Sequence, residues 1–246
     1  MLKVKSNMKG NILNIISIII LIIVQYFIAK EVGTSLIGYG FYVNAVILFM
    51  LFCIEFILIS LMLAFYAEHF FRKDGIIALI RFRSREKTYL LVVKNTIIKI
   101  IAIKLVCYLT YSVFIIALYK EINSQDIVLA FVFNLTVSII LYVLQIKLEI
   151  RYGAKLALLV TNSLYIMLTV LGSILNELKI INTGLLSKIC NLLNKLLITN
   201  YLYLERIKLL NIRYFPLFLI LIVILTLFIF IGKPIRKKLD ITEEKN

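Results

Sequence analysis

Long runs of apolar residues alternate along this chain with short polar and basic segments. Most of the runs approach the ~20 residues that an α-helix needs to cross a ~30 Å hydrocarbon layer. They are continuous and do not alternate with polar residues, so a membrane β-barrel is not expected. The pattern predicts an all-α integral membrane fold in a single domain, residues 1–246, with six transmembrane helices. The expected spans are about 11–29, 41–66, 95–119, 127–147, 156–173 and 215–232.

The positions of the charged residues predict how the chain is oriented in the membrane. Most of the 28 Lys and Arg residues fall before the first span, after the second, after the fourth and after the sixth. Basic residues accumulate on the cytoplasmic side of membrane proteins. We therefore expect both termini in the cytoplasm. The richness in Ile, Leu, Lys and Asn is typical of an AT-rich genome, which favours a multi-pass protein of a bacterial cytoplasmic membrane.

The composition narrows the classes of function. The chain is 62% hydrophobic, and its mean hydropathy is +1.01. A formal charge of +15 would suggest nucleic acid in a soluble protein, but here the basic residues flank apolar runs, so no nucleic-acid partner is expected. The three cysteines form no CxxC pair, and His69 is the only histidine. A disulfide framework or a metal site is therefore not expected.

Sequence signatures of catalysis are also missing. The one Gly-Lys pair, Gly232-Lys233, is followed by Pro234 and lacks the upstream glycine and the Ser or Thr of a nucleotide-binding loop. There is no HExxH motif, and His69 stands at the edge of a span. We expect no catalytic, metal or cofactor-binding residues on this chain, which is therefore not expected to be an enzyme.

Four polar residues inside the spans are candidates for a translocation path: Glu55, Lys104, Asn134 and Asn162. A charge at the centre of a membrane helix costs about 2.5–3.5 kcal/mol on insertion scales, so Glu55 should face protein or water. The second and third spans are antiparallel neighbours, and the helix rise puts Glu55 and Lys104 at a similar depth. Two interpretations stay open, a polar element of a path and a structural ion pair. Single amides in spans more often join helices.

The segment between the fifth and sixth spans has a helical pattern of its own, at 183–210. Leu185, Ile189 and Leu192 fall on one face, with Leu193 and Leu196, while Ser187, Lys188, Asn191, Asn194 and Lys195 fall on the other. Thr183 is placed to cap such a helix. The pattern predicts an extracellular amphipathic helix that lies at an interface or against a partner.

The segment 68–94 is longer and more basic than a connection between two spans requires. It contains an acidic residue, a basic pair, a glycine, a short apolar stretch, an arginine-rich Ser-Arg element and a lysine. In order these are Glu68, Arg72, Lys73, Gly75, Leu79 within Ile76–Ile80, Arg81, Arg83, Ser84, Arg85 and Lys94. The simplest alternative is an ordinary loop whose positive charge only orients the chain.

This ordered pattern resembles the segment after the second span in permease subunits of bacterial ATP-binding-cassette (ABC) exporters of the second exporter class. Where the family typically has a proline before Ser-Arg, this chain has Phe82, and the added arginines are similar to small divergent permeases of low-GC Gram-positive bacteria. The resemblance implies a cytoplasmic coupling helix between spans two and three that docks on a separate ATPase. It implies contacts from Glu68, Arg72, Lys73, Gly75, Leu79, Arg81, Arg83, Ser84 and Arg85.

The same resemblance implies partners and a function. ATP and magnesium would bind to a cytoplasmic ATPase dimer, and the permease would pair with a second copy or a paralogous permease. The outer segment 183–210 resembles the family's re-entrant or interfacial helices. The implied function is export of an amphipathic peptide, toxin or lipid-like substrate taken from membrane lipid. Two alternatives remain, the membrane subunit of an importer and a non-transport immunity or sensor protein.

Overall fold

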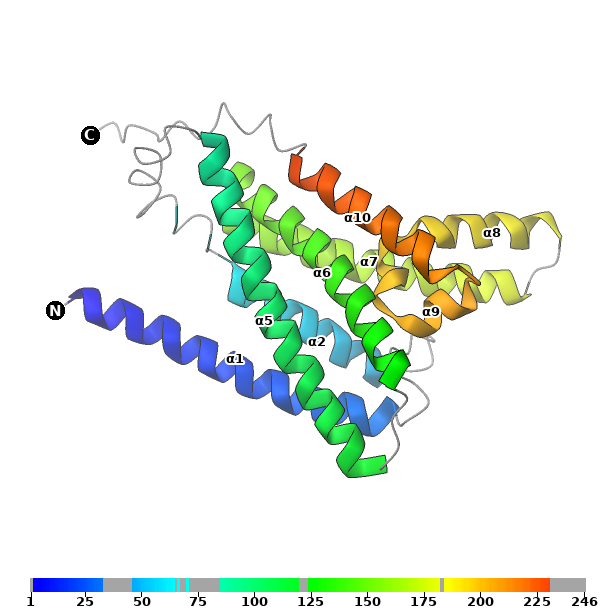
Figure 1. The fold of residues 1–246 in the computed structure, drawn as a ribbon, viewed down its shortest axis with the longest axis horizontal. Coiled ribbons are helices and arrows are strands. Elements are labelled where there is room, and N and C mark those ends of the chain that lie inside the picture. Colours follow the sequence, from blue (N-terminus) through cyan, green and yellow to red (C-terminus); the bar gives the residue numbers. More distant parts are fainter. Residues whose placement is uncertain are drawn as a thin grey trace.

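The computed structural model describes residues 2–32, 46–64, 66, 70, 85–119, 124–181 and 184–230. The described chain is helical apart from short turns (Figure 1). The long helices are α1 (Leu2–Val32), α2 (Val46–Leu63), α5 (Arg85–Tyr119), α6 (Ser124–Tyr152), α7 (Ala154–Ile181) and α10 (Tyr214–Phe230). The short ones are α8 (Leu185–Leu196), the 3₁₀ helix η1 (Ile198–Leu202) and α9 (Leu204–Leu209).

Three of these helices are long and apolar enough to cross a membrane. Their apolar stretches are Lys87–Leu118, Gln125–Tyr152 and Ala154–Ile181, in α5, α6 and α7. Shorter apolar stretches lie in the other long helices, at Ile15–Lys30, Phe49–Leu63 and Tyr214–Phe230. The all-helical architecture is therefore compatible with a membrane protein, and the number of six spans stays a prediction.

Helix α6 is the centre of the bundle. Of its most apolar stretch 56% is buried, against 28% for α5 and 33% for α7. It packs against α5, α7, α10 and η1 (Figure 1). The buried residues Phe133, Val137, Ile140 and Tyr142 give α6 an apolar core face that is shared with α2 and α10.

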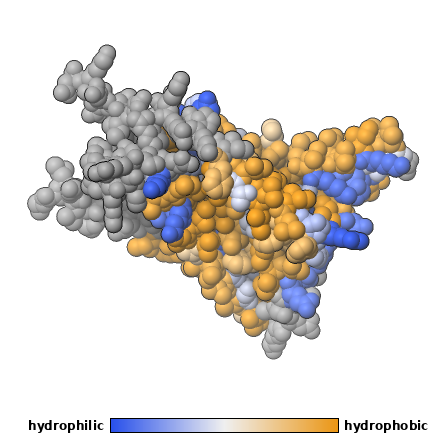
Figure 2. All heavy atoms as spheres, turned by 45° about the horizontal axis from the view of Figure 1, so that its top comes forward, coloured by the Kyte–Doolittle hydropathy of each residue, from blue (hydrophilic) through white to orange (hydrophobic). Residues whose placement is uncertain are grey.

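The outer faces of the helices are apolar as well. Ile19 on α1 and Leu109 and Val113 on α5 are 52%, 58% and 61% exposed, and Figure 2 shows a largely hydrophobic outer surface. A soluble protein rarely exposes so large a contiguous apolar surface. A lipid environment removes the cost of that exposure, which explains why the chain is hydrophobic inside and outside.

Helix α5 is longer than a membrane crossing requires. It begins at Arg85, ten residues before the predicted start of the third span at about residue 95, and runs for 35 residues. At 1.5 Å per residue its length is about 52 Å, against a hydrocarbon layer of ~30 Å. The helix is therefore longer than one crossing, and its first turns, residues 85–94, belong to segment 68–94.

Helix α7 also continues beyond its predicted end. The sequence places the end of the fifth span at Ser173, whereas α7 extends to Ile181. Asn176 and Lys179 lower the local hydropathy without breaking the helix, since neither is a strong helix breaker. The predicted cap Thr183 lies outside the described residues, and Gly184, with φ of 83°, precedes α8.

Helix α8 is amphipathic as predicted, and its apolar face points away from the protein. Its buried residues Cys190 and Asn194 lie on the side that packs against α7. Leu185, Leu192 and Leu196 are 76%, 64% and 73% exposed. The α7–α8 hairpin projects from the bundle in Figure 1, and in Figure 2 the projecting arm has apolar residues along one edge and polar ones along the other. An exposed apolar helix face of this kind suits lipid or a partner.

Candidate functional site

A buried ion pair joins α2 to α5. The ammonium Nζ of Lys104 donates a hydrogen bond to Oε1 of Glu55 at 2.7 Å, across 49 positions of sequence. The side chains of Lys104 and Glu55 are only 4% and 10% exposed. Burying an unpaired charge is expensive, and an ion pair recovers much of that cost. The contact that sequence reasoning left open is therefore present.

An aromatic stack lies next to this ion pair. The ring of Phe56 stacks on Tyr142, with ring centroids 4.9 Å apart, and on Tyr165, with centroids 4.0 Å apart. The Tyr142 hydroxyl also donates a hydrogen bond to the Phe56 carbonyl at 3.2 Å. Stacked aromatic pairs stabilise beyond the apolar area they bury. The residue after Glu55 is thus held between α6 and α7.

A second polar contact fixes α2 against α6. The Ser60 hydroxyl donates to Oε1 of Gln145 at 2.8 Å, and Nε2 of Gln145 donates to the Ser60 carbonyl at 2.9 Å. The two residues are 0% and 1% exposed. A buried amide without partners is costly, so this reciprocal pair sets the register of the two helices. Gln145 therefore acts as a contact between helices.

The two candidate asparagines lie apart from the ion pair's hydrogen bonds. Nδ2 of Asn134 donates to the Leu202 carbonyl at 3.1 Å and so attaches α6 to η1. Asn162 is half-buried on α7, and its Oδ1 accepts no hydrogen bond within the described part of the chain. The structure joins Glu55 to Lys104 directly and gives Asn134 a different partner.

The residues expected to contact an ATPase lie almost entirely outside the described residues. These are Glu68, Arg72, Lys73, Gly75, Leu79, Arg81, Arg83 and Ser84. Arg85 is the first residue of α5, and its side chain is also outside the description. The docking interpretation of this segment therefore stays a prediction from sequence.

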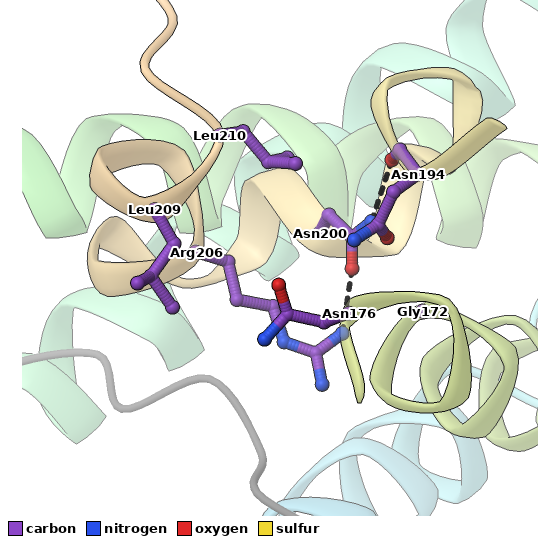
Figure 3. A pocket seen from close by; sticks show the side chains of 7 residues that line it. All are labelled: Gly172, Asn176, Asn194, Asn200, Arg206, Leu209 and Leu210. Atoms are coloured by element: carbon purple, nitrogen blue, oxygen red, sulfur yellow. Dashed lines mark hydrogen bonds between the residues drawn. The ribbon is translucent and has the colours of Figure 1, made fainter. Parts of the chain in front are cut away.

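A polar pocket at the base of the α7–α8 hairpin is a site that the sequence did not predict. It is lined by Gly172, Asn176, Asn194, Asn200, Arg206, Leu209 and Leu210, from α7, α8, η1 and the end of α9 (Figure 3). The cavity volume is about 10 Å³. This is close to the ~10–15 Å³ that one water molecule needs. The pocket therefore has room for a single oxygen-sized group.

Arg206 is the central side chain of this pocket and is only 5% exposed. Its Nη1 donates to Oδ1 of Asn200 at 2.5 Å, and its Nη2 donates to the Ser173 hydroxyl at 2.6 Å. Asn200 in turn donates from Nδ2 to the carbonyl and to Oδ1 of Asn194, at 2.7 and 2.6 Å. This network fixes the guanidinium between α7 and η1 and ties η1 to α8.

Gly172 makes the approach of these groups possible. A Cβ at this position would lie 2.8 Å from Nη1 of Arg206 and closer still to Oδ1 of Asn200. Both distances are shorter than normal contacts of a carbon atom. Any side chain larger than hydrogen would therefore displace the Arg206–Asn200 hydrogen bond from the surface of α7.

Tyr203 lies between the pocket and the buried aromatic stack. Its hydroxyl is 2.7 Å from that of Tyr165, and its ring packs edge-on against Phe52 with centroids 4.9 Å apart. The Arg206 guanidinium carbon lies 5.9 Å from the centre of the Tyr203 ring. A continuous set of contacts therefore runs from the Arg206 pocket through Tyr203 and Tyr165 to Phe56.

Burial changes the acid–base properties of the pocket. It lowers the pKa of the Arg206 guanidinium to about 10, and the nearby Tyr203 and Tyr165 oppose that shift. Burial likewise raises the pKa of the Tyr201 hydroxyl, which donates to the Lys195 carbonyl. At neutral pH Arg206 therefore keeps its positive charge and the Tyr201 hydroxyl stays protonated.

Neither site has the ligands of a metal centre. In the part of the chain that the structure describes, no group of three or more His, Cys, Asp or Glu side chains is placed to hold a metal ion. The pocket at Arg206 presents one cation and three amides, which are suited to hydrogen bonding with an oxygen acceptor.

Sequence reasoning missed this pocket because its residues follow no spacing motif. Asn176, Asn194, Asn200 and Arg206 come from four different elements, α7, α8, η1 and α9, and each amide alone is unremarkable in a polar segment. The sequence contained one weaker signal, the arginine Arg206 within a short apolar segment. An arginine is seldom fully buried unless polar groups surround it, so its position indicated nearby polar partners.

Comparison with known proteins finds no matching family model, no similar curated protein and no similar solved structure. The resemblance to exporter permeases therefore rests on the residues of segment 68–94 and on the pattern of apolar runs.

Proposed function

We propose that this chain is the membrane-spanning permease subunit of an ATP-driven ABC exporter. The observation that carries the proposal is the ordered acidic, basic, glycine, apolar and Ser-Arg pattern in segment 68–94. The 35-residue length of α5 supports it, since the helix exceeds the hydrocarbon layer by about 20 Å and its first turns, residues 85–94, are part of that segment. In this proposal the chain has six spans, with both termini and segment 68–94 in the cytoplasm.

The proposed mechanism assigns the chemistry of ATP hydrolysis to the partner. Gly75 and the apolar residues up to Leu79 seat in a cleft of the ATPase, and Arg83 and Arg85 pair with its acidic groups. Closure of the ATPase dimer on ATP moves two permeases as rigid bodies, which opens a path between them. The substrate class is an amphipathic peptide, toxin or lipid-like molecule, and the chain itself carries no catalytic residue.

The ion pair of Glu55 and Lys104 contributes to rigid-body movement in this proposal. It joins α2, which precedes segment 68–94, to α5, whose first turns form the end of that segment. The Ser60–Gln145 pair and the Phe56 stack extend that attachment to α6 and α7. A force applied at segment 68–94 therefore reaches α6 and α7 through buried contacts in the middle and second half of α2.

One observation favours each alternative. An importer subunit would need a pocket with converging polar groups, and the Arg206 pocket has them, although about 10 Å³ is too small for a whole solute. An immunity or sensor protein would need an outer partner surface, and the exposed apolar face of α8 is suitable. Neither alternative accounts for the ordered pattern in segment 68–94.

The test is purification of the tagged chain from its native membrane in mild detergent, followed by mass spectrometry. We expect a soluble protein with nucleotide-binding motifs in stoichiometric amount, and its loss in the double variant Arg83→Glu, Arg85→Glu. The matched control is Lys237→Glu, Lys238→Glu, which changes the charge equally in the basic C-terminal segment and should keep the ATPase. Equal loss in both variants, or no ATPase after crosslinking, would contradict the proposal.

A further inference from the structure

The Arg206 pocket has an unused polar group facing its cation. The amide of Asn176 makes no hydrogen bond with any residue that the structure describes, although its neighbours Asn194 and Asn200 do. Figure 3 shows the Asn176 side chain beside the Arg206 guanidinium at the pocket. A half-buried amide next to a guanidinium offers N–H donors to an oxygen that enters between them.

The guanidinium is held in place before any ligand arrives. Asn200 and Ser173 accept hydrogen bonds from Nη1 and Nη2, and the absence of a Cβ at Gly172 allows this close arrangement. A donor group fixed in advance loses little conformational entropy on binding. Such preorganisation distinguishes a binding site from a flexible arginine on a surface.

The charge of the pocket selects the ligand. Among the described residues that line it there is no acidic side chain, and Arg206 remains positively charged at neutral pH. Hydrogen bonds from a guanidinium to an anionic oxygen are about twice as strong as those between neutral groups. A negatively charged oxygen therefore fits the pocket better than a neutral or cationic group.

The size of the pocket sets how much of the ligand enters. A volume of about 10 Å³ admits one oxygen atom, and Leu209, 43% exposed, borders the pocket. We propose that this pocket binds one anionic oxygen of a phosphate or carboxylate group, held by the Arg206 guanidinium and the Asn176 amide, while the rest of the ligand lies outside. This inference goes beyond the proposed function and does not depend on an ATPase partner.

Two sources supply this chemistry, an anionic lipid headgroup and a small anion from solution. Asn194 of α8 lines the pocket, and the apolar side chains of α8 are exposed on its other face, so membrane lipid is one source of an anionic oxygen near this helix. A free phosphate or acetate ion reaches the same group without a lipid. The shared chemistry is the anionic oxygen, and the experiment separates its sources.

The test uses the purified full chain in maltoside micelles, which contain no phosphate and no charge. The melting temperature is measured with added phosphatidylglycerol, with inorganic phosphate, or with acetate, all at matched ionic strength. A ligand that binds only the folded state raises the melting temperature as its concentration exceeds Kd. We expect such a rise with at least one of the three additions, and a response to lipid alone assigns the lipid headgroup as the source.

Two variants of Asn176 make the test specific. Asn176→Ala removes one hydrogen bond to a charged group. About ten times more additive should therefore be needed for the same rise in melting temperature. Asn176→Asp places a carboxylate beside Arg206, where it takes the place of the ligand. This variant should melt at a higher temperature than the wild type without additive, and additives should raise it no further.

The matched control is Asn191→Asp, because Asn191 lies on α8, also has an unpartnered amide oxygen in the described chain, and does not line the pocket. It should respond to the additives like the wild type. An unchanged melting temperature of the wild type with all three additives would overturn the proposal. So would an Asn176→Ala variant that responds at the wild-type concentration.

Discussion

Glu55 and Lys104 form an ion pair between α2 and α5, in which Nζ of Lys104 lies 2.7 Å from Oε1 of Glu55 and both side chains are almost completely buried. Each charge alone would be costly in a membrane helix, and together they attach α2 to α5, the helices before and at the end of segment 68–94. The relationship supports two interpretations, a structural attachment and a polar part of a transport path. Stability and transport measured on the same variants separate these interpretations.

Removal of one partner of this pair should destabilise the protein strongly. Lys104→Met leaves the Glu55 carboxylate buried without its cation, which typically costs about 3–5 kcal/mol. The double variant Glu55→Leu, Lys104→Met removes both charges, and its unfolding free energy should return to the wild-type value or exceed it. Unfolding in mixed micelles, followed by circular dichroism, gives these values.

The ion pair of Lys208 and Asp126 is the control for this prediction. Its nitrogen–oxygen distance is 3.1 Å, but its side chains are 38% and 29% exposed. Exposed pairs contribute about 0–1 kcal/mol, so Lys208→Met should change the unfolding free energy little. An equal cost at both lysines would show that the buried pair has no special role. Loss of transport in a stable Glu55/Lys104 double variant would favour the transport path.

Gly172→Ala should destabilise the attachment of η1 and α9 to α7. The added Cβ would overlap Oδ1 of Asn200 and approach Nη1 of Arg206, so the hydrogen bond between these side chains must shift. Overpacking of this kind costs about 1–3 kcal/mol. Leu171→Ala, at an exposed neighbouring position, should change the unfolding free energy by less. Equal stability of Gly172→Ala and wild type would contradict the described geometry.

Tyr165 and Tyr203 should be energetically coupled. Their hydroxyls lie 2.7 Å apart in a buried position, so Tyr165→Phe leaves the Tyr203 hydroxyl without this partner. A neutral buried hydrogen bond contributes about 0.5–1.5 kcal/mol. A double-mutant cycle with Tyr203→Phe should give a coupling energy of that size, and Tyr201→Phe should show none with Tyr165. If the losses of unfolding free energy from the two single variants at Tyr165 and Tyr203 simply add in the double variant, the hydrogen bond is excluded.

The contribution of Arg206 to stability should not depend on pH near neutrality. Burial lowers its pKa to about 10 in the folded chain, below its pKa in the unfolded chain, so the unfolded chain binds more protons only from about pH 10 upwards. Stability linked to this group is therefore constant between about pH 6 and pH 9 and rises as the pH increases above about 10. The difference in unfolding free energy between wild type and Arg206→Met measures it. A slope below pH 9 would contradict this pKa.

The sequence predicted the all-helical character of the chain, because hydropathy and helix rise determine it locally. The similar depth of Glu55 and Lys104 follows from counting residues along two antiparallel helices, and the structure brings them together. The pattern of α8 was also readable, because its period of 3.6 separates leucines from polar residues. The regular geometry of an α-helix, its rise in the first case and its period in the second, was sufficient for both predictions.

The features that depend on tertiary contacts were not predictable in this way. The extension of α7 to Ile181 was missed because Asn176 and Lys179 resemble a loop in a hydropathy profile. The pocket at Arg206 was missed because its amides come from separate elements. The face of α8 that packs against α7 could be identified only in the structure, since amphipathicity alone does not say which face a neighbour covers.

Contact between segment 68–94 and an ATPase is the basis of the proposed exporter function. The most direct measurement is site-specific photo-crosslinking in native membranes, with a photoreactive amino acid at Leu79 and, as the control, at Lys120, which the proposed topology places on the opposite side of the membrane. We predict an adduct from position 79 that contains a protein with nucleotide-binding motifs, and none from position 120. Adducts from position 79 that contain only lipid or this chain itself would contradict the proposed contact between segment 68–94 and an ATPase.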